Sequence, residues 1–239
     1  MKTKRFLAAV CAITLSFGAS AQASSISVAT FDLTAFASSM GGNFSLEDFE
    51  AYSGGALTGA LTGTNVGTFS TLGGTGSGST CNSNGGGSCS ANLAIQDDII
   101  NGQGNLVPIS GTKSLNSNDT LGIKWDVSRV GSASFNRLIF GLRDGGEFQS
   151  LTVSAGGDTA TFGPGAGNGN EKLVVIDFSG FVTSASVEMR HSGLNDGFTI
   201  DAATAAAVPL PAGAVLAMTG LAGLMALGRK RRRKASSDV

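Results

Sequence analysis

Few side chains in this sequence have the types and spacing that enzyme catalysis needs. The 239 residues contain a single histidine, His191, and no Gly-x-Ser-x-Gly motif, so a serine hydrolase triad has no recognisable nucleophile. Acidic pairs such as Glu47 with Glu50, or Asp97 with Asp98, have the chemistry of a glycosidase, but an acid-rich domain produces such pairs by chance. We therefore expect His191 to lie at the surface or at a strand end, and we expect no enzymatic activity.

Charge is divided unevenly along the chain. Nine of the sixteen Lys and Arg residues lie in residues 2–5 and 229–234, whereas sixteen of the seventeen Asp and Glu residues lie between these two ends. The part between the ends therefore carries a formal charge of −9. An acidic domain repels phosphate backbones, which argues against nucleic-acid binding.

The N-terminus has the pattern of a secretory signal peptide. A cationic start in residues 1–5 precedes an apolar run to about residue 19, and Ala21 and Ala23 supply the small residues that signal peptidase requires. We expect signal peptidase to cleave after Ala23, so that the mature protein is exported and residues 1–23 are removed.

Export determines what the cysteines can do. Cys11 is lost with the signal, which leaves Cys81 and Cys89 as a pair in an oxidising compartment. The residues between them are flexible enough for disulfide geometry, and the closed loop would stabilise the fold by about 2–3 kcal/mol. A zinc site would need further Cys or His ligands nearby, and the sequence has none. We therefore predict a Cys81–Cys89 disulfide.

The C-terminal end combines three features in a fixed order. Val208-Pro209-Leu210-Pro211-Ala212 is followed by an uncharged run to Gly228 and then by the basic cluster at 229–234. As a helix, residues 210–228 would span about 28 Å, close to the about 30 Å hydrocarbon core of a bilayer. We expect one transmembrane helix there, with the basic cluster in the cytoplasm and the rest of the chain on the far side.

This tail resembles the VPLPA-type relatives of the PEP-CTERM sorting signals of Gram-negative bacteria. The resemblance implies that residues 204–239 are a spacer and a sorting signal, and that an exosortase, a membrane-embedded cysteine transpeptidase, recognises residues 208–212. The inner-membrane precursor would then become a protein of the cell surface or extracellular matrix. A plain tail anchor with a chance Pro-containing motif is the alternative. The resemblance assigns the recognition motif to Val208, Pro209, Leu210, Pro211 and Ala212.

The region between the two ends, residues 24–203, has the pattern of one all-β domain. Short apolar or alternating runs are separated by Gly, Ser, Asn and Asp clusters, and no long period of 3.6 residues is present. This pattern predicts an antiparallel β-sandwich that is jelly-roll-like. The runs cover residues 42–52, 66–72, 93–96, 121–127, 135–142, 148–155, 159–162, 172–178, 182–189 and 198–202.

Residues 54–87 are rich in Gly, Ser and Thr and contain few large apolar residues. Neither Gly-x-x-x-x-Gly-Lys nor Gly-x-Gly-x-x-Gly occurs, so the glycines do not indicate a nucleotide site. We expect a long surface loop with the disulfide at its end.

Residues 43–50 and 195–201 resemble the first and last strands of carbohydrate-binding-module-like jelly rolls. In those folds the terminal strands lie near each other, and a Phe-Glu together with a late Asp often holds a structural Ca²⁺. Carboxylate oxygens of this kind suit calcium, while solvated acids at strand ends are the alternative. The resemblance implies a calcium site at Glu50 and Asp201, with Glu47, Asp48 and Asp196 as further candidates.

Two classes of function fit these features. One is a structural or interaction protein of the cell envelope or matrix, and the other is a carbohydrate-binding module for exopolysaccharide or a surface glycan. Sugar platforms need exposed aromatic rings, and the one Trp and one Tyr, Trp125 and Tyr52, lie in strand patterns where packing is the commoner fate. The sequence therefore favours the structural class.

Overall fold

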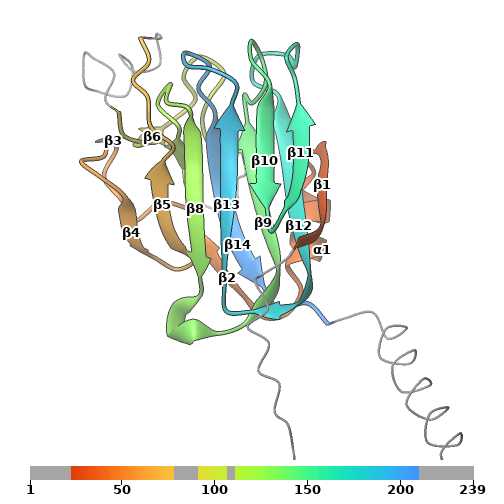
Figure 1. Ribbon diagram of the computed structural model, residues 1–239. Coiled ribbons are helices and arrows are strands. Elements are labelled where there is room, and N and C mark those ends of the chain that lie inside the picture. The colour runs from red at the N-terminus through yellow and green to blue at the C-terminus, as the bar shows by residue number, and fades with distance from the viewer. Residues whose placement is uncertain (1–22, 78–90, 107–110, 210–239) are drawn as a thin grey trace, which may run out of the picture.

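The computed structural model describes residues 23–77, 91–106 and 111–209. Strands within these residues form two antiparallel sheets that face each other as a sandwich (Figure 1). The all-β expectation is confirmed. The expected signal peptide up to residue 22, Cys81, Cys89 and the tail from residue 210 lie outside the described residues.

The first sheet contains β9 near its centre and also carries the last described strand, β14. Strand β2 (Phe44–Glu47) pairs with β14 beside the main path of this sheet. The order along that path is β1 (Ala23–Thr30), β12 (Glu171–Val182), β9 (Phe135–Arg143), β14 (Thr199–Ala206), β7 (Lys113–Asn116), β6 (Ala94–Asp97) and β3 (Gly55–Ala56).

The second sheet is formed by antiparallel neighbours throughout and lies in front of the first in Figure 1. Two short helical segments complete the described chain, α1 (Leu33–Met40) and the 3-10 turn η2 (Val130–Ser132). The order of the second sheet is β11 (Asp158–Phe162), β10 (Leu151–Ala155), β13 (Ser184–His191), β8 (Gly122–Ser128), β5 (Gly67–Thr71) and β4 (Leu61–Thr64).

The main core fills the space between the sheets. Leu138, Phe140 and Leu142 alternate along β9 and all belong to it, as the period of two predicts. At its centre Trp125 is fully buried, stacks on Phe69 with ring centroids 5.4 Å apart and donates its indole N–H to the carbonyl of Val66 at 3.0 Å. A buried indole that keeps a hydrogen-bond partner avoids the cost of an unsatisfied donor.

A second, smaller core lies on the outer face of the first sheet, where α1 packs. Phe36 of α1 contacts Ile139 of β9 and Leu173 of β12, which point away from the main core. The helix begins at Asp32, whose side chain accepts the Ala35 N–H at 2.8 Å. Sequence periodicity did not predict α1, because the helix is only eight residues long and Phe36 is its only fully buried residue.

Each of the ten predicted runs overlaps a strand of the structure, but the expectation of one long loop over residues 54–87 is wrong in part. Strands β3, β4 and β5 all fall within it. Leu61 pairs with Phe69 and Thr64 with Gly67 in the β4–β5 hairpin, and both Leu61 and Phe69 are buried in the main core. Together with the buried Val66, these few apolar residues are enough to build strands from a segment that is otherwise mostly small and polar.

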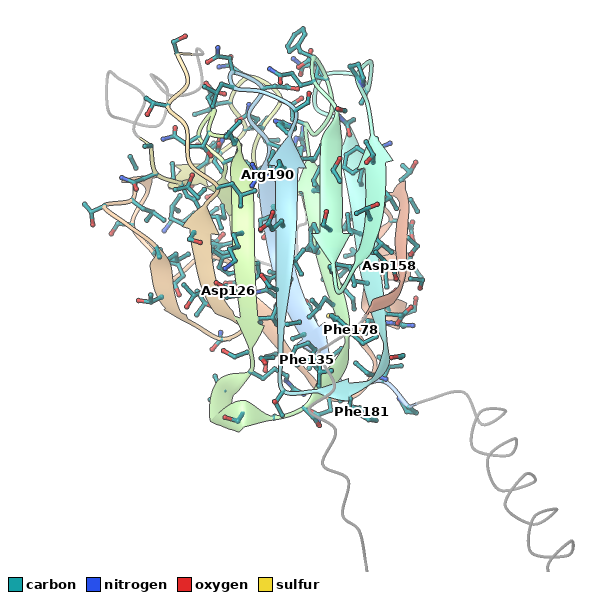
Figure 2. The ribbon with its side chains drawn as sticks, viewed as in Figure 1. Asp126, Phe135, Asp158, Phe178, Phe181 and Arg190 are labelled. Carbon is teal, nitrogen blue, oxygen red and sulfur yellow. The ribbon has the colours of Figure 1, made fainter. Side chains whose placement is uncertain are left out.

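Both ends of the described chain lie at one end of the sandwich. Ala23 of β1 pairs with Phe178, and Ala206 of β14 pairs with Arg137 near the start of β9. Figure 2 shows Phe135 and Phe178 toward this lower end, with Arg190 of β13 toward the upper end. A strand rises about 3.3 Å per residue, so the length of β9 separates the two ends by roughly 30 Å.

The first and last strands of the jelly-roll resemblance are neighbours in space. Residues of β2 pair with β14, with Glu47 opposite Ala203 and Phe44 opposite Ala206. The last strand continues to Ala206, past the expected domain boundary at residue 203, because its backbone is hydrogen-bonded to β2 and β9 along this stretch. Within the described residues, no helix has the length and apolar character to cross a bilayer.

Candidate functional site

A polar pocket lies at the upper end of the sandwich, opposite the two chain ends. Loops that follow β6, β7, β9, β11 and β13 form it, and its cavity volume is about 240 Å³. It is lined by the carboxylates Asp119, Asp144, Glu147 and Asp196, the amides Asn101, Gln103, Asn168 and Asn195, and by Phe148 and Gly197.

The local sequence explains why these loops turn sharply enough to converge. Asn101, Asp119, Asp144 and Asn195 all have positive φ angles, between 52° and 66°. Asn and Asp tolerate this left-handed conformation better than other residues with a Cβ, because their side chains bond to nearby backbone groups. The pocket is thus lined largely by Asn and Asp residues from the clusters that separate the strands in the sequence.

Part of the glycine-rich segment borders this pocket. The Ser77 N–H donates to Oδ1 of Asn195 at 2.5 Å. A Cβ on Gly76 would lie 2.5 Å from the carbonyl oxygen of Asp119, closer than side chains tolerate, so only glycine permits this approach. The glycines here serve backbone packing against the rim.

Asp196 shapes the loop that carries Phe148. Its Oδ2 accepts the backbone N–H groups of Phe148 at 3.2 Å and Gln149 at 2.7 Å. Asp196 is 4% exposed, whereas the Phe148 side chain is 72% exposed. The buried Asp196 carboxylate therefore fixes the loop backbone, while the aromatic ring of Phe148 faces solvent at the edge of the pocket.

Asp144 is the most strongly perturbed acid of the site. It is buried, its Oδ1 accepts the Gly169 N–H at 2.6 Å, and it follows directly after β9. Burial, together with the charges of Glu147 and Asp196, raises the pKa of Asp144 to about 6, although the Gly169 bond acts in the opposite direction. The pocket therefore takes up a proton in a mildly acidic solution.

His191 is the last residue of β13, so the expectation of a strand-end position is confirmed. It does not lie at the surface, because its side chain is buried, with 1% exposure. Its Nε2 lies 4.0 Å from Oδ2 of Asp196, and neither ring nitrogen has a hydrogen-bond partner among the described residues. The ring packs edge-on against Phe198 with centroids 5.0 Å apart. Burial lowers the pKa of His191, while the nearby Asp196 acts in the opposite direction.

The carboxylates expected to hold calcium are occupied by backbone donors. Glu50 Oε1 accepts the Lys113 N–H at 2.6 Å, and Asp201 accepts the N–H groups of Ala202 at 2.6 Å and Leu106 at 3.3 Å. Among the residues that the structure describes, no group of three or more His, Cys, Asp or Glu side chains is arranged to hold a metal ion. A calcium site at Glu50 and Asp201 stays a prediction.

The three further candidate calcium ligands lie in different parts of the structure and bond to different backbone groups. Glu47 is buried and accepts the N–H groups of Phe49 at 3.1 Å and Asn65 at 3.0 Å. Asp48 Oδ1 accepts the Glu50 N–H at 3.2 Å. Asp196 alone of the five lines the pocket.

Neither aromatic residue considered from the sequence as a sugar platform is exposed as one. Trp125 is fully buried, as its strand position predicted, and Tyr52 is half-buried against the main core in the turn that follows β2. Phe148 was missed because only Trp and Tyr were considered, although Phe148 begins one of the predicted runs. An apolar residue directly after an Asp-Gly-Gly-Glu turn was the available signal.

No known protein-family model matches this chain, and no curated protein sequence shows significant similarity to it. The function must therefore be argued from the geometry of the fold and of the pocket.

We expect Asp144→Asn to stabilise the protein at neutral pH. The folded state binds the Asp144 proton more tightly than the unfolded chain does, so the ionised carboxylate lowers stability increasingly as the pH rises from about 4 through 6. Asn keeps an oxygen acceptor for Gly169 and removes the charge. Allowing for screening at the pocket mouth, the gain in free energy of unfolding should be about 1–2 kcal/mol near pH 7.5, and less than half of that near pH 4.5.

Urea unfolding at both pH values measures this difference. Asp158→Asn on β11 (Figure 2) is the matched control, because its carboxylate is half-exposed and away from the pocket. The lowered pKa of His191 makes its contribution to stability rise with pH, opposite to that of Asp144. This contribution is present in the wild type and in Asp144→Asn, so it cancels when the two free energies of unfolding are subtracted. A stability difference between Asp144→Asn and the wild type that is the same at both pH values would contradict the raised pKa of Asp144.

A calcium site at Glu50 and Asp201 predicts that the melting temperature rises when calcium replaces EDTA. The rise should vanish in Asp201→Asn, which removes a charged oxygen ligand, and should persist in Asp126→Asn on the exposed face of β8. Thermal unfolding in calcium, magnesium and EDTA checks this. Equal melting temperatures in all three buffers would refute the calcium site.

Proposed function

We propose that this protein is a non-enzymatic exported protein of the cell envelope or extracellular matrix, sorted by an exosortase-type transpeptidase through its C-terminal signal. The observation that carries the proposal is the place where the chain leaves the fold. Val208, the first residue of the expected motif, follows β14 at the lower end of the sandwich, and the polar pocket lies at the opposite end. A domain attached there presents its pocket away from the attachment point.

The exit point of the chain is fixed by hydrogen bonds. Asn136 donates its Nδ2–H to the Val208 carbonyl at 2.9 Å, and its Oδ1 accepts the Val208 N–H at 2.7 Å. Val208 packs against the second core, close to Gly41, whereas Pro209 is exposed. The fold therefore holds the first motif residue and leaves the next one accessible, which suits recognition of residues 208–212 by a membrane enzyme at the outer interface.

The remaining parts of the proposal come from the sequence. Signal peptidase would remove residues 1–23, a transmembrane helix at about 210–228 would hold the precursor in the inner membrane, and the basic cluster at 229–234 would stay in the cytoplasm. The pairing of β2 with β14 supports a jelly-roll-like arrangement of the sandwich. Export also places Cys81 and Cys89 where a disulfide forms.

If an exosortase reads the motif, the mature protein should lose its tail and leave the membrane fraction. Replacing Pro209 and Pro211 together by Ala should block this, because without proline the helix can extend backward and bury the motif. Fractionation of a protein tagged after Ser24 measures the change, with a Ser236→Ala/Ser237→Ala double variant as the control beyond the basic cluster. The same full-length membrane band in wild type, in the proline variant and in cells without the exosortase would mean a plain tail anchor.

The disulfide gives an independent test of export. Intact mass measurement after alkylation without reduction should show no alkylated thiol in the mature protein, and two after reduction, because Cys11 has been removed. Cytoplasmic expression without the signal provides the reduced reference. Two free thiols in the exported protein would contradict the bridge.

A further inference from the structure

We propose that the pocket at the upper end binds one neutral sugar ring of a glycan, with its amide and carboxylate groups on the sugar hydroxyls and Phe148 against the C–H face of the ring. This inference goes beyond sorting and stands on the described pocket residues alone. It assigns a ligand class to the end of the domain that points away from the chain exit.

The size of the pocket limits the ligand to one small ring. Its volume of about 240 Å³ lies below the about 300–1,000 Å³ of pockets that enclose drug-sized molecules. The mouth is formed by loops from separate strands, so the rest of a longer glycan can extend into solvent. A single recognised ring within a longer chain fits these dimensions.

The lining matches hydroxyl groups in particular. The Asn168 amide carries both a donor and an acceptor and is exposed at the rim, and the exposed Asn195 amide adds N–H donors. Carboxylates accept strong hydrogen bonds from O–H groups. The acids themselves are held in place by backbone donors, as the Gly169 N–H holds Asp144. Carboxylate acceptors beside exposed amides suit a ligand that carries several hydroxyls close together.

The charge of the pocket selects among sugars. Its charged lining residues are all acids. The neighbouring Arg143 donates to the Gly102 carbonyl at 2.7 Å and is ion-paired with Glu171 at 2.5 Å, so its charge is already matched by an acid. A uronic acid or a sulfated sugar would bring a further negative charge to this site and would be repelled. The pocket should therefore prefer neutral sugars over acidic ones.

Phe148 supplies the apolar part of the contact. Burying a Phe side chain ordinarily stabilises a fold, yet this ring is 72% exposed while its backbone N–H is bonded to Asp196. An exposed aromatic ring next to hydrogen-bonding groups is the arrangement that binds one apolar face and one polar edge of the same ligand. The C–H face and the hydroxyl edge of a pyranose ring provide these two surfaces.

The test uses the full-length protein in detergent on an array of neutral and uronic-acid-containing oligosaccharides. We expect binding to neutral glycans and at least tenfold weaker binding to their acidic counterparts. Phe148→Ala should reduce binding at least tenfold and Phe148→Trp should preserve it. Phe181→Ala at the lower end (Figure 2) removes a comparably exposed ring, 52% exposed, and should leave binding unchanged.

A rim variant, competition by the free monosaccharide and binding in the presence of EDTA complete the test. Asn168→Ala, at an exposed rim position, should weaken binding without changing the melting temperature, which separates recognition from folding. Competition by the free monosaccharide shows whether one ring is enough. Binding that is absent for every neutral glycan, unchanged in Phe148→Ala, stronger for uronates or abolished by EDTA would each overturn the proposal. None of these readouts depends on processing of the tail, so failure here leaves the sorting proposal intact.

Discussion

The double burial of β9 is the constraint on which the rest of the structure depends. Its two edges are hydrogen-bonded to β12 and β14, its inner side chains fill the main core, and Ile139 on its outer face packs under α1. A strand covered on both faces and paired on both edges cannot shift register without exposing apolar side chains. Strand β9 also positions residues at both ends of the sandwich. Asn136 near its start bonds to Val208, and Asp144 just past its end lines the pocket.

Strands with alternating large apolar residues could be predicted from the sequence, and those built from small residues could not. Leu138, Phe140 and Leu142 give a clear period of two, and the structure places them together in the main core. The sequence analysis assigns residues from 204 onward to a spacer, but Thr204, Ala205 and Ala206 belong to β14, which is buried along its whole length. Small side chains let β2 and β9 lie on either side of it, so burial there comes from close backbone packing and leaves little hydrophobic signal.

The pocket could not be predicted because it is a property of the loops taken together. Its residues span positions 101 to 197, and each local cluster of Asn, Asp and Gly is equally consistent with an ordinary turn. Only the pairing of β9, β13 and β7 in their observed registers brings these turns to one end of the sandwich. His191 illustrates the same point. Its position at a strand end could be expected, but its burial depends on Phe198 and Asp196, which both lie in the loop between β13 and β14.

The acids of the pocket connect its stability to its capacity for binding. Burial, and then the charges of Glu147 and Asp196, raise the pKa of Asp144, so its ionised form is unfavourable in the folded protein. Backbone N–H groups from Gly169, Phe148 and Gln149, together with the Gln103 side chain, offset part of this. A ligand rich in hydroxyl groups adds donors to the same carboxylates without adding negative charge. The feature that costs the domain stability at neutral pH is therefore the one that gives a neutral polyhydroxylated ligand its hydrogen-bonding partners.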